Sequence, residues 1–277
     1  MNVDLNRTYD FAKYIRTKTI EMALNCGKAG CHIGGSLSCV EILAVLYGHF
    51  LHYNPQNPTD IHRDRFFASK AHCAPSLYAA LAKAGFVAES DLAIYRVDGG
   101  LLTGYPFNLQ IGLEFTGGSL GMGLSLGVGA ALSARRKGLA YKSVVLLGDG
   151  ECNEGSIWEA LMSAAQFQLD NLVVIVDYNN MQYDGKSTEI MSLENFEAKL
   201  NAFGCNTQVV DGHSIEALIA AFSVQTKNQP LAVIAKTIKA KGIQRLEDTA
   251  ESHFTFITQE DYDLAMAEIE KGKYDRV

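Results

Sequence analysis

Proline is scarce in this 277-residue chain, which contains five prolines and none between Phe107 and Gln229. The sequence also lacks a Pro- or Ser-rich linker, an internal repeat and a block of like charges. Because 48% of the residues are hydrophobic and 20% are charged, the composition excludes a disordered or low-complexity protein. Glycine is instead abundant, with 25 residues, which predicts close approach of the backbone at helix contacts or at a ligand.

A basic charge excess, paired cysteines and an apolar leader are lacking as well. The chain has 24 Lys and Arg against 31 Asp and Glu, a net charge of −7, so we expect neither nucleic acid nor an anionic membrane as a partner. The six cysteines form no C-x-x-C pair, and Met1–Arg7 holds no apolar run typical of a secretory signal. We therefore expect reduced thiols and a cytoplasmic protein.

One uncharged segment, residues 115–134, has the length of a membrane span. Ten of its 20 residues are Gly, Ser or Thr, a composition too polar for such a span. The segment is therefore predicted to be a Gly-rich turn followed by a buried helix.

Short apolar runs alternate with helical patterns along the chain. Strands are predicted at residues 65–69, 143–147, 171–176, 207–210 and 231–235. Helices are predicted at residues 9–25, 40–50, 157–168, 215–224 (with Ser214 as N-cap) and 259–271. Strands that are apolar on both faces belong in parallel sheets covered by helices. The order of elements predicts an α/β fold with a doubly wound, mostly parallel sheet and helices on both faces.

Polar residues follow two of these strands at one crossover spacing. Gly148-Asp149-Gly150 comes directly after one strand, and Asn179 follows the next strand, 30 residues later. Both side chains should then lie at the carboxyl edge of adjacent strands, where open α/β folds bind ligands. Carboxylate, amide and carbonyl oxygens suit Mg²⁺ or Ca²⁺ with diphosphate oxygens completing the shell. The alternative is that each motif is an ordinary turn.

With its neighbours, this pattern resembles the transketolase family. The motifs that carry the resemblance are Cys31-His32-Ile33-Gly34-Gly35-Ser36 (family Gly-His-Pro-Gly-Gly-Ser), Asp64-Arg65-Phe66-Phe67-Ala68-Ser69-Lys70-Ala71-His72 (family Asp-Arg-Phe-hydrophobic-Leu-Ser-Lys-Gly-His), Glu114-Phe115-Thr116-Gly117-Gly118-Ser119-Leu120-Gly121-Met122-Gly123 (family Glu-Phe-Thr-Thr-Gly-Ser-Leu-Gly-Gln-Gly), Gly148–Gly155 and Lys236–Gly242. They occur in order over essentially the whole chain. The resemblance implies the thiamine diphosphate-binding fold, with thiamine diphosphate and Mg²⁺ (or Ca²⁺) as cofactors.

The resemblance also assigns roles to individual residues. The implied metal ligands are Asp149, the Asn179 side chain and the Met181 carbonyl. The implied cofactor contacts are His72, Gly118, Ser119, Leu120, Gly148, Asp149, Gly150, Glu154, Asn179 and His253. The implied catalytic residues are His32, His72 and His253, because histidines can move protons on and off sugar hydroxyls near neutral pH. Glu154 resembles a glutamate of the network across the family's subunit interface; otherwise it is a helix N-terminal carboxylate. His49, His52, His62 and His213 are taken as ordinary core or surface histidines.

The resemblance covers only the diphosphate-binding domain of a full transketolase. We therefore expect residues 1–277 to form this single domain, with the pyrimidine-binding and C-terminal domains on a separate C-terminal subunit. The implied enzyme transfers a two-carbon ketol unit from a ketose to an aldose, as a dimer of heterodimers. In the family, the glutamate that acts on the cofactor's pyrimidine ring lies in the second domain, so the chain is expected to be active only with its partner.

Three departures from the family pattern matter most, at Ile33, Ala71 and Tyr105. Tyr105 stands where the family has a histidine that contacts the donor sugar, so the predicted substrate-facing residues are His32, Tyr105 and His253. A phenol titrates near ~10 rather than ~6.5, which puts the standard donor in doubt. The alternatives are an unchanged activity on the standard donor, or an unusual ketose such as a sulfo-sugar or a branched sugar phosphate.

Two other classes of function are alternatives to a transketolase subunit. Gly121-x-Gly123 and Gly127-x-Gly129 suggest a dinucleotide fingerprint, but a poor strand precedes them and no suitably placed acidic residue follows. A regulatory module built on an inactive cofactor domain is the non-enzyme alternative. The intact Asp149 and Asn179 pair argues against it.

Overall fold

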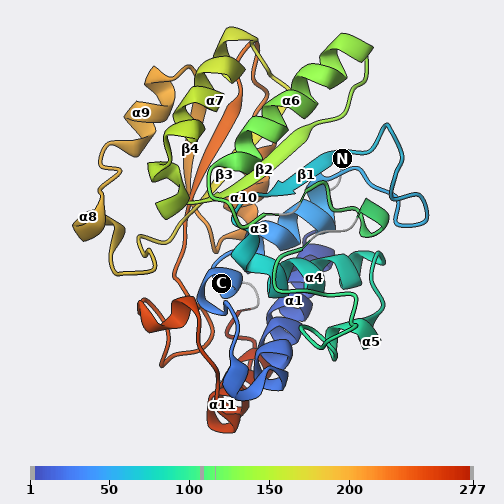
Figure 1. The fold of residues 1–277 in the computed structure, drawn as a ribbon, viewed down its shortest axis with the longest axis vertical. Coiled ribbons are helices and arrows are strands. Elements are labelled where there is room, and N and C mark those ends of the chain that lie inside the picture. Colours follow the sequence, from blue (N-terminus) through green and yellow to red (C-terminus); the bar gives the residue numbers. More distant parts are fainter. Residues whose placement is uncertain (1–3, 107–108, 116, 275–277) are drawn as a thin grey trace.

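One five-stranded sheet organises the chain in the computed structural model, which describes residues 4–106, 109–115 and 117–274 (Figure 1). All neighbouring strands pair in parallel, in the order β1-β2-β3-β5-β4. Their bounds are β1 Arg65–Ala68, β2 Ser143–Gly148, β3 Leu172–Tyr178, β4 Asn206–Asp211 and β5 Leu231–Lys236. The carboxyl ends of all five strands therefore meet at one edge of the sheet.

Helices cover both faces of the sheet (Figure 1). One face carries α6 (Met122–Lys137), α7 (Gly155–Gln166) and α9 (Phe196–Ala202). The other carries α1 (Leu5–Asn25), α3 (Val40–Val45), α4 (Ala74–Ala84) and α10 (Ile215–Phe222), with α11 (Gln259–Glu270) packed on α1. Shorter helices are α2 (Gly34–Leu37), α5 (Glu89–Leu92) and α8 (Ser187–Ile190).

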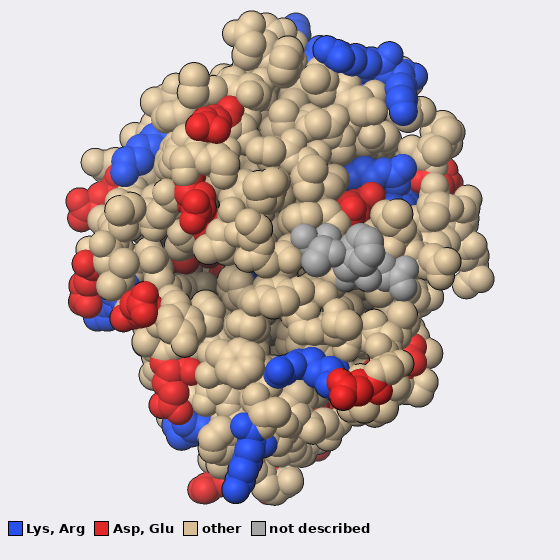
Figure 2. All heavy atoms as spheres, viewed as in Figure 1, with Lys and Arg blue, Asp and Glu red and all other residues tan. Residues whose placement is uncertain are grey.

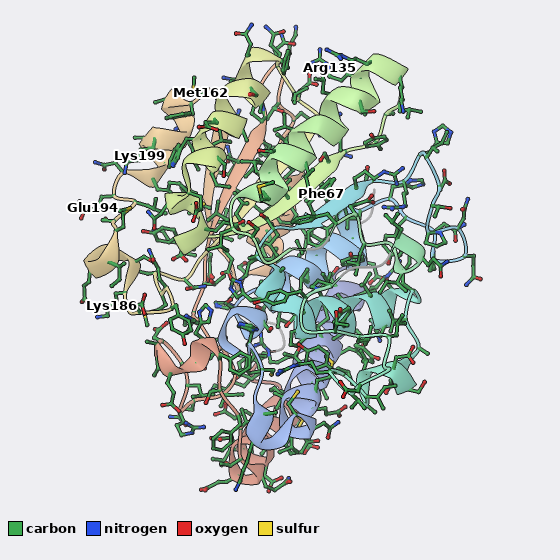
Figure 3. The ribbon with its side chains drawn as sticks, viewed as in Figure 1. Phe67, Arg135, Met162, Lys186, Glu194 and Lys199 are labelled. Carbon is green, nitrogen blue, oxygen red and sulfur yellow. The ribbon has the colours of Figure 1, made fainter. Side chains whose placement is uncertain are left out.

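Two separate cores result from the alternation of side chains along each strand. On β2, Val144 and Leu146 join the core under α1, α3, α4 and α10, whereas Val145 and Leu147 join the core under α6 and α7. Phe67, on β1, belongs to the second core and is labelled in Figure 3. The same alternation on β3 and β5 explains why these strands are apolar on both faces.

The predicted elements agree closely with the structure. The predicted doubly wound sheet is confirmed, and Ser214 caps α10 by accepting a hydrogen bond from the Ala217 N–H at 3.2 Å. Helix α1 begins at Leu5, a turn before the prediction, because Asp4 accepts the Arg7 N–H. The predicted helix over 40–50 is α3 followed by a wider π turn, Leu46–Phe50.

The prediction of a buried helix within 115–134 was wrong for one side of α6. Leu124, Val128 and Ala131 are buried against the sheet, but Met122 and Leu126 on the opposite side are exposed. Sequence hydrophobicity cannot separate a face that packs in the same chain from one left for another surface.

Two smaller expectations concern the membrane and the thiols. In the described residues, no helix combines the length and apolar character needed to cross a membrane. All six cysteines are free thiols, five of them buried.

Candidate functional site

A cavity of about 300 Å³ opens at the carboxyl edge of the sheet. Most of the residues singled out in the sequence line it, although they come from segments far apart in the chain. The lining residues are His32, Gly35, Ser69, Lys70, Ala71, His72, Tyr105, Gly118, Leu120, Gly148, Asp149, Gly150, Glu151, Asn179, Met181, Gln182, Tyr183, Asp184, Lys239 and His253. The fold therefore gathers the predicted metal, cofactor and substrate residues around one space.

Asp149 lies at the bottom of this cavity, immediately after β2, and is 2% exposed. One carboxylate oxygen accepts the Gly150 N–H at 2.8 Å and the other accepts the Ser187 hydroxyl at 3.2 Å. Burial and the nearby carboxylate of Asp177 raise the pKa of Asp149 to about 6. A bound cation would stabilise this buried negative charge, so the environment of Asp149 fits a metal ligand.

Asn179 follows β3, which pairs with β2. Two hydrogen bonds fix the orientation of its side-chain amide. Its amide nitrogen donates to Asp177 at 3.4 Å, and its amide oxygen accepts the Met181 N–H at 3.1 Å. Asp177 thus turns the amide oxygen toward the loop that carries Met181, in the way that hydrogen-bond partners behind a metal ligand orient it. No group of three or more His, Cys, Asp or Glu forms a metal site in the described ranges. The oxygen set of Asp149, Asn179 and Met181 therefore fits a hard cation that takes further oxygens from a ligand.

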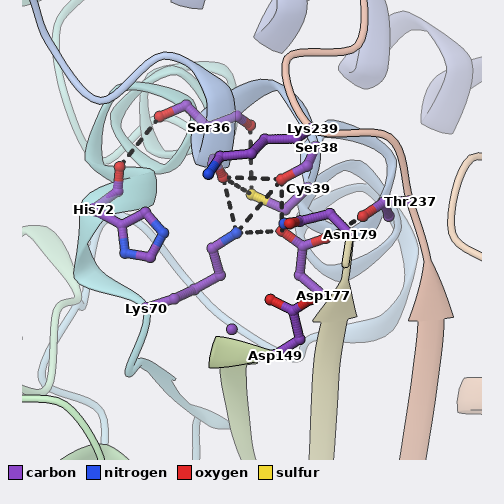
Figure 4. Close-up of polar contacts among 12 residues, drawn as sticks. Ser36, Ser38, Cys39, Lys70, His72, Asp149, Asp177, Asn179, Thr237 and Lys239 are labelled. Carbon is purple, nitrogen blue, oxygen red and sulfur yellow. Dashed lines mark hydrogen bonds and ion pairs between the residues drawn. The ribbon is translucent and has the colours of Figure 1, made fainter. Parts of the chain in front are cut away.

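Beneath these residues lies a fully buried ion pair between Lys70 and Asp177 (Figure 4). Asp177 also accepts the Ser38 hydroxyl at 2.5 Å and the Thr237 hydroxyl, and Lys70 donates to the Gly35 carbonyl at 2.9 Å. Burial alone would raise the pKa of Asp177, but the adjacent ammonium of Lys70 outweighs it and lowers that pKa. This satisfied pair forms the floor of the cavity.

Three histidines form one wall. The rings of His72 and His253 stack with centroids 5.2 Å apart, and His32 lies 5.5 Å from His253 and 5.9 Å from His72. Burial, together with neighbouring cations, lowers the pKa of His32 to about 4 and that of His253 to about 3. The histidines are therefore neutral at pH 7 and able to accept protons.

Lys239 brings a second cation to the cavity and has no role in the sequence-based prediction. Its amine donates to the Gln182 carbonyl at 3.1 Å and lies 3.3 Å from Nδ1 of His253. Burial and the charge of Lys70 lower the pKa of Lys239 to about 8. An anionic group in the cavity would pair with this amine, which suits a diphosphate. A lysine four residues past the end of a predicted apolar strand was the signal that could have identified it.

Glu151 is another buried residue that the sequence did not single out. Its carboxylate accepts the Ser69 hydroxyl, the Gly121 N–H at 3.0 Å and the Gly148 N–H at 3.1 Å. These bonds tie the start of α6 to the end of β2. Glu151 therefore holds the Gly-rich turn against the metal edge.

Two predicted cofactor residues are not brought to the cavity. Ser119 and Glu154 are exposed and are not among its lining residues, although Gly118 and Leu120 on either side of Ser119 are. Glu154 precedes α7 as its N-cap, without a side-chain capping bond. Both positions lie on the open side of the site, where a second surface could reach them.

Ala71 and Gly117 are in contact across the cavity wall. A Cβ atom built on Gly117 would lie 2.1 Å from Cβ of Ala71. In the family motifs quoted above, Gly stands at the position of Ala71 and Thr at the position of Gly117. The two departures therefore compensate for each other in volume.

The rim of the site is apolar and exposed. Leu120, Met122 and Leu126 are 45%, 48% and 43% exposed, and they belong to the same turn and helix. Tyr105 is also exposed at the rim, with its ring centroid 6.0 Å from that of His32. In the view of Figure 2, uncharged side chains cover much of this face, with charged side chains scattered between and around them. Such a surface is typical of an interface.

A hard-cation site, two lysines and three neutral histidines at the carboxyl edge of a parallel sheet define a cofactor-binding α/β domain for a diphosphate ligand. Residues 8–271 match the family described as transketolase, thiamine diphosphate binding domain. The chain belongs to the transketolase family. The predicted cofactors, thiamine diphosphate with a divalent metal, and the predicted enzyme class, a transferase, are confirmed.

Separate small subunits are found among the relatives. The chain is 40% identical over 256 residues to one of the subunits of the apulose-4-phosphate transketolase of Phocaeicola vulgatus, covering 92% of this chain and 90% of that one. It is 39% identical over 264 residues to 6-deoxy-6-sulfo-D-fructose transketolase subunit SqwG of a Clostridium species, covering 94% and 95%. The predicted N-terminal subunit of a split transketolase is thereby confirmed.

Full-length transketolases match over a smaller share of their length. Human transketolase is 40% identical over 245 residues, which are 88% of this chain but 39% of that protein. The solved transketolase of Leishmania mexicana superposes with a TM-score of 0.88 at 29% identity, covering 98% of this chain and 42% of that one.

Proposed function

We propose that this chain holds the diphosphate end of thiamine diphosphate, and its metal, for ketol transfer from a ketose to an aldose. The observation that carries the proposal is the pairing of Asp149 and Asn179 with Met181 at one end of a cavity that also contains Lys239. The single domain 1–277 supplies this half of the active site. When bound, the cofactor would supply a nucleophilic carbon for the ketose carbonyl and an electron sink for the cleaved two-carbon unit.

The side chains divide the remaining work. Asp149, Asn179 and the Met181 carbonyl hold the metal, and Lys239 pairs with the diphosphate charge. Gly118, Gly148 and Gly150 let the ligand approach the backbone, with Ser119, Leu120 and Glu154 completing contacts on the open side. His72 and His253 lie at the cofactor, and His32 faces the substrate, each as a neutral imidazole that accepts a proton from a hydroxyl at pH 7.

The second half of the active site comes from a C-terminal subunit in this proposal. The exposed apolar rim of Leu120, Met122 and Leu126 is the surface on which that subunit would pack. Two such pairs would associate as a dimer of heterodimers, a heterotetramer. Relatives named as transketolase subunits match over 90% and 95% of their own length, which supports a partner that supplies the remaining domains.

The substrate is a ketose that bears an anionic group distant from the reacting carbonyl. The relatives named for apulose 4-phosphate and for 6-deoxy-6-sulfo-D-fructose support either a branched sugar phosphate or a sulfo-sugar. Tyr105 supports a specialised donor, because its ring lies at the rim near His32, where the family has a histidine. The alternative is that Tyr105 leaves the activity unchanged and the chain acts on the standard donor of the family.

Cytoplasmic location is part of the proposal. Six free thiols, none paired within the described residues, favour a reducing compartment. Fractionation of the native cells would place the chain in the cytosol or contradict this.

Thermal unfolding of the purified chain tests the cofactor. We expect thiamine diphosphate with Mg²⁺ to raise the Tm, NAD to leave it unchanged, and Asp149→Asn to abolish the rise. A rise with NAD instead would favour a dinucleotide enzyme.

Activity tests the enzyme. The chain co-expressed with its C-terminal subunit should transfer a two-carbon unit within a panel of sugar phosphates and sulfo-sugars, whereas the chain alone should not. Cofactor binding with no transfer to any acceptor would favour the regulatory alternative. Transfer by the isolated chain would refute the split active site.

A further inference from the structure

A second buried ionic cluster lies outside the cavity, and the proposed function does not use it. Arg16 from α1 is 1% exposed and forms an ion pair with Glu41 from α3, whose other oxygen lies 2.9 Å from Nδ1 of His213. His213 follows β4, so the cluster joins three distant segments. Glu41 is buried between the two partners, and its pKa is lowered to about 2, because Arg16 and His213 outweigh the effect of burial.

The other side of the His213 ring contacts the segment that enters the cavity. Its Nε2 accepts the backbone N–H of Ile238 at 2.8 Å. Ile238 lies between Thr237, whose hydroxyl donates to Asp177, and Lys239, whose amine reaches the cavity. The His213 ring thus holds the segment that carries both Thr237, which bonds to Asp177 in the floor, and Lys239, whose amine lines the cavity.

These contacts fix the form of the imidazole. The Ile238 N–H is a donor, so Nε2 must be an acceptor without a proton, and the single ring proton is on Nδ1, where it donates to Glu41. A carboxylate that holds one ring nitrogen while the other acts is the arrangement that orients histidines in many sites. A cavity beside this ring is lined by further polar groups, among them Asp211, Ser214, Glu216 and Lys241.

We infer that His213, oriented by Glu41, is a positioning residue for the cofactor site. It holds the Ile238 backbone so that Thr237 secures Asp177 and Lys239 presents its amine to an anionic ligand. His213 touches neither ligand nor reacting atoms, and it acts through this one backbone bond. The inference rests on the proposed function for the identity of the ligand, but not for the position of Lys239.

Two substitutions of His213 each keep the hydrogen bond of only one ring nitrogen. The amide oxygen of Gln in His213→Gln reaches as far as Nε2 and can still accept the Ile238 N–H. The shorter side chain in His213→Asn reaches only as far as Nδ1, so it keeps a donor for Glu41 and loses the acceptor. His62→Asn, at an exposed histidine, is the matched control.

The first measurement is the Kd for thiamine diphosphate at saturating Mg²⁺, by calorimetry on the full chain. We expect His213→Asn to raise the Kd roughly tenfold, the effect of one lost hydrogen bond, with His213→Gln and His62→Asn within about twofold of wild type. Equal effects of Asn and Gln, or a wild-type Kd in both, would overturn the inference.

The second measurement does not require the cofactor. Lys239 is 1% exposed, so its acetylation by an acid anhydride, followed by mass spectrometry, reports whether the segment has moved. We expect several-fold faster labelling in His213→Asn and wild-type labelling in His213→Gln. Unchanged labelling in His213→Asn would overturn the inference. If the wild-type chain binds no thiamine diphosphate, the proposed function fails and this labelling alone decides the positioning role.

Discussion

The floor and the rim of the cavity are built in opposite ways. The floor is buried and internally satisfied: Lys70 and Asp177 are both 0% exposed, Asp177 accepts the hydroxyls of Ser38 and Thr237, and Lys70 donates to the Gly35 carbonyl. The rim exposes apolar side chains, including Leu120 and Leu126, on one turn and the helix that follows it. The floor is therefore complete within one chain, whereas the described part of the chain leaves the rim exposed, as expected of a surface that the proposed partner subunit covers.

The difference between the buried floor and the exposed rim corresponds to two different requirements of the site. A metal and diphosphate need fixed charges, which a single folded domain can provide through buried, fully paired groups. A substrate pocket between chains needs a surface that remains available until the partner arrives. We expect substitutions in the floor to alter folding, and substitutions in the rim to alter assembly.

The largest expected effect on folding is in the floor. Lys70→Met leaves Asp177 as an unpaired buried carboxylate, which should lower the free energy of unfolding by about 3–5 kcal/mol. Urea denaturation measures this loss. The control is Lys199→Met, at an exposed lysine of α9 labelled in Figure 3, which should change stability by no more than about 0.5 kcal/mol. Similar losses for the two variants would contradict a floor held by its ion pair.

A smaller loss of stability is expected at the contact between Gly117, in the turn before α6, and Ala71, which follows Lys70. Gly117→Ala places a methyl group 2.1 Å from Cβ of Ala71, an overlap that should cost about 1–3 kcal/mol. Adding Ala71→Gly to this variant removes the clashing atom and should recover most of the loss. The double-mutant cycle is measured by denaturation, and additive effects would show that the two positions do not share one volume.

The histidine wall should make stability depend on pH. The pKa of His32 is about 4 in the folded chain against an ordinary 6.5, so the unfolded chain takes up protons first as the pH falls. This contribution to stability is complete above about pH 6.5 and is lost as the pH falls toward 4. We expect the Tm to drop between pH 7 and pH 5, and to drop less in the double variant His32→Gln and His253→Gln. An identical drop in that variant would assign the effect to other groups.

The smallest effect on folding is expected at the rim. Leu126→Asp should change the stability of the isolated chain by no more than about 0.5 kcal/mol, because the side chain is already 43% exposed. It should nevertheless prevent co-purification with the C-terminal subunit, since a carboxylate would be buried in the interface. Leu264→Asp, at an exposed leucine of α11, is the control and should still co-purify. Normal pairing of Leu126→Asp would place the partner elsewhere.

The sequence alone was sufficient to predict the five strands, most of the helices and the place of Asp149 and Asn179. Strands β2, β3 and β5 are short apolar runs, and parallel strands bring their carboxyl ends to one edge, so a polar residue that follows β2 or β3 must lie there. It was insufficient for α6, because an apolar face looks the same whether it packs in this chain or awaits another. His213 was predicted to be an ordinary histidine, and nothing in its local sequence indicates the bond to Ile238.

What the sequence determined by itself is thus the chemistry at the strand ends, because it depends on periodicity and on spacing within single βαβ units. The tertiary structure decided which charges meet. Lys70 and Asp177 are 107 residues apart, and Glu41 and His213 are 172 apart. Their pairing depends on how helices and strands pack across the sheet. No local pattern encodes that packing, yet it sets the charge of the floor and the position of Lys239.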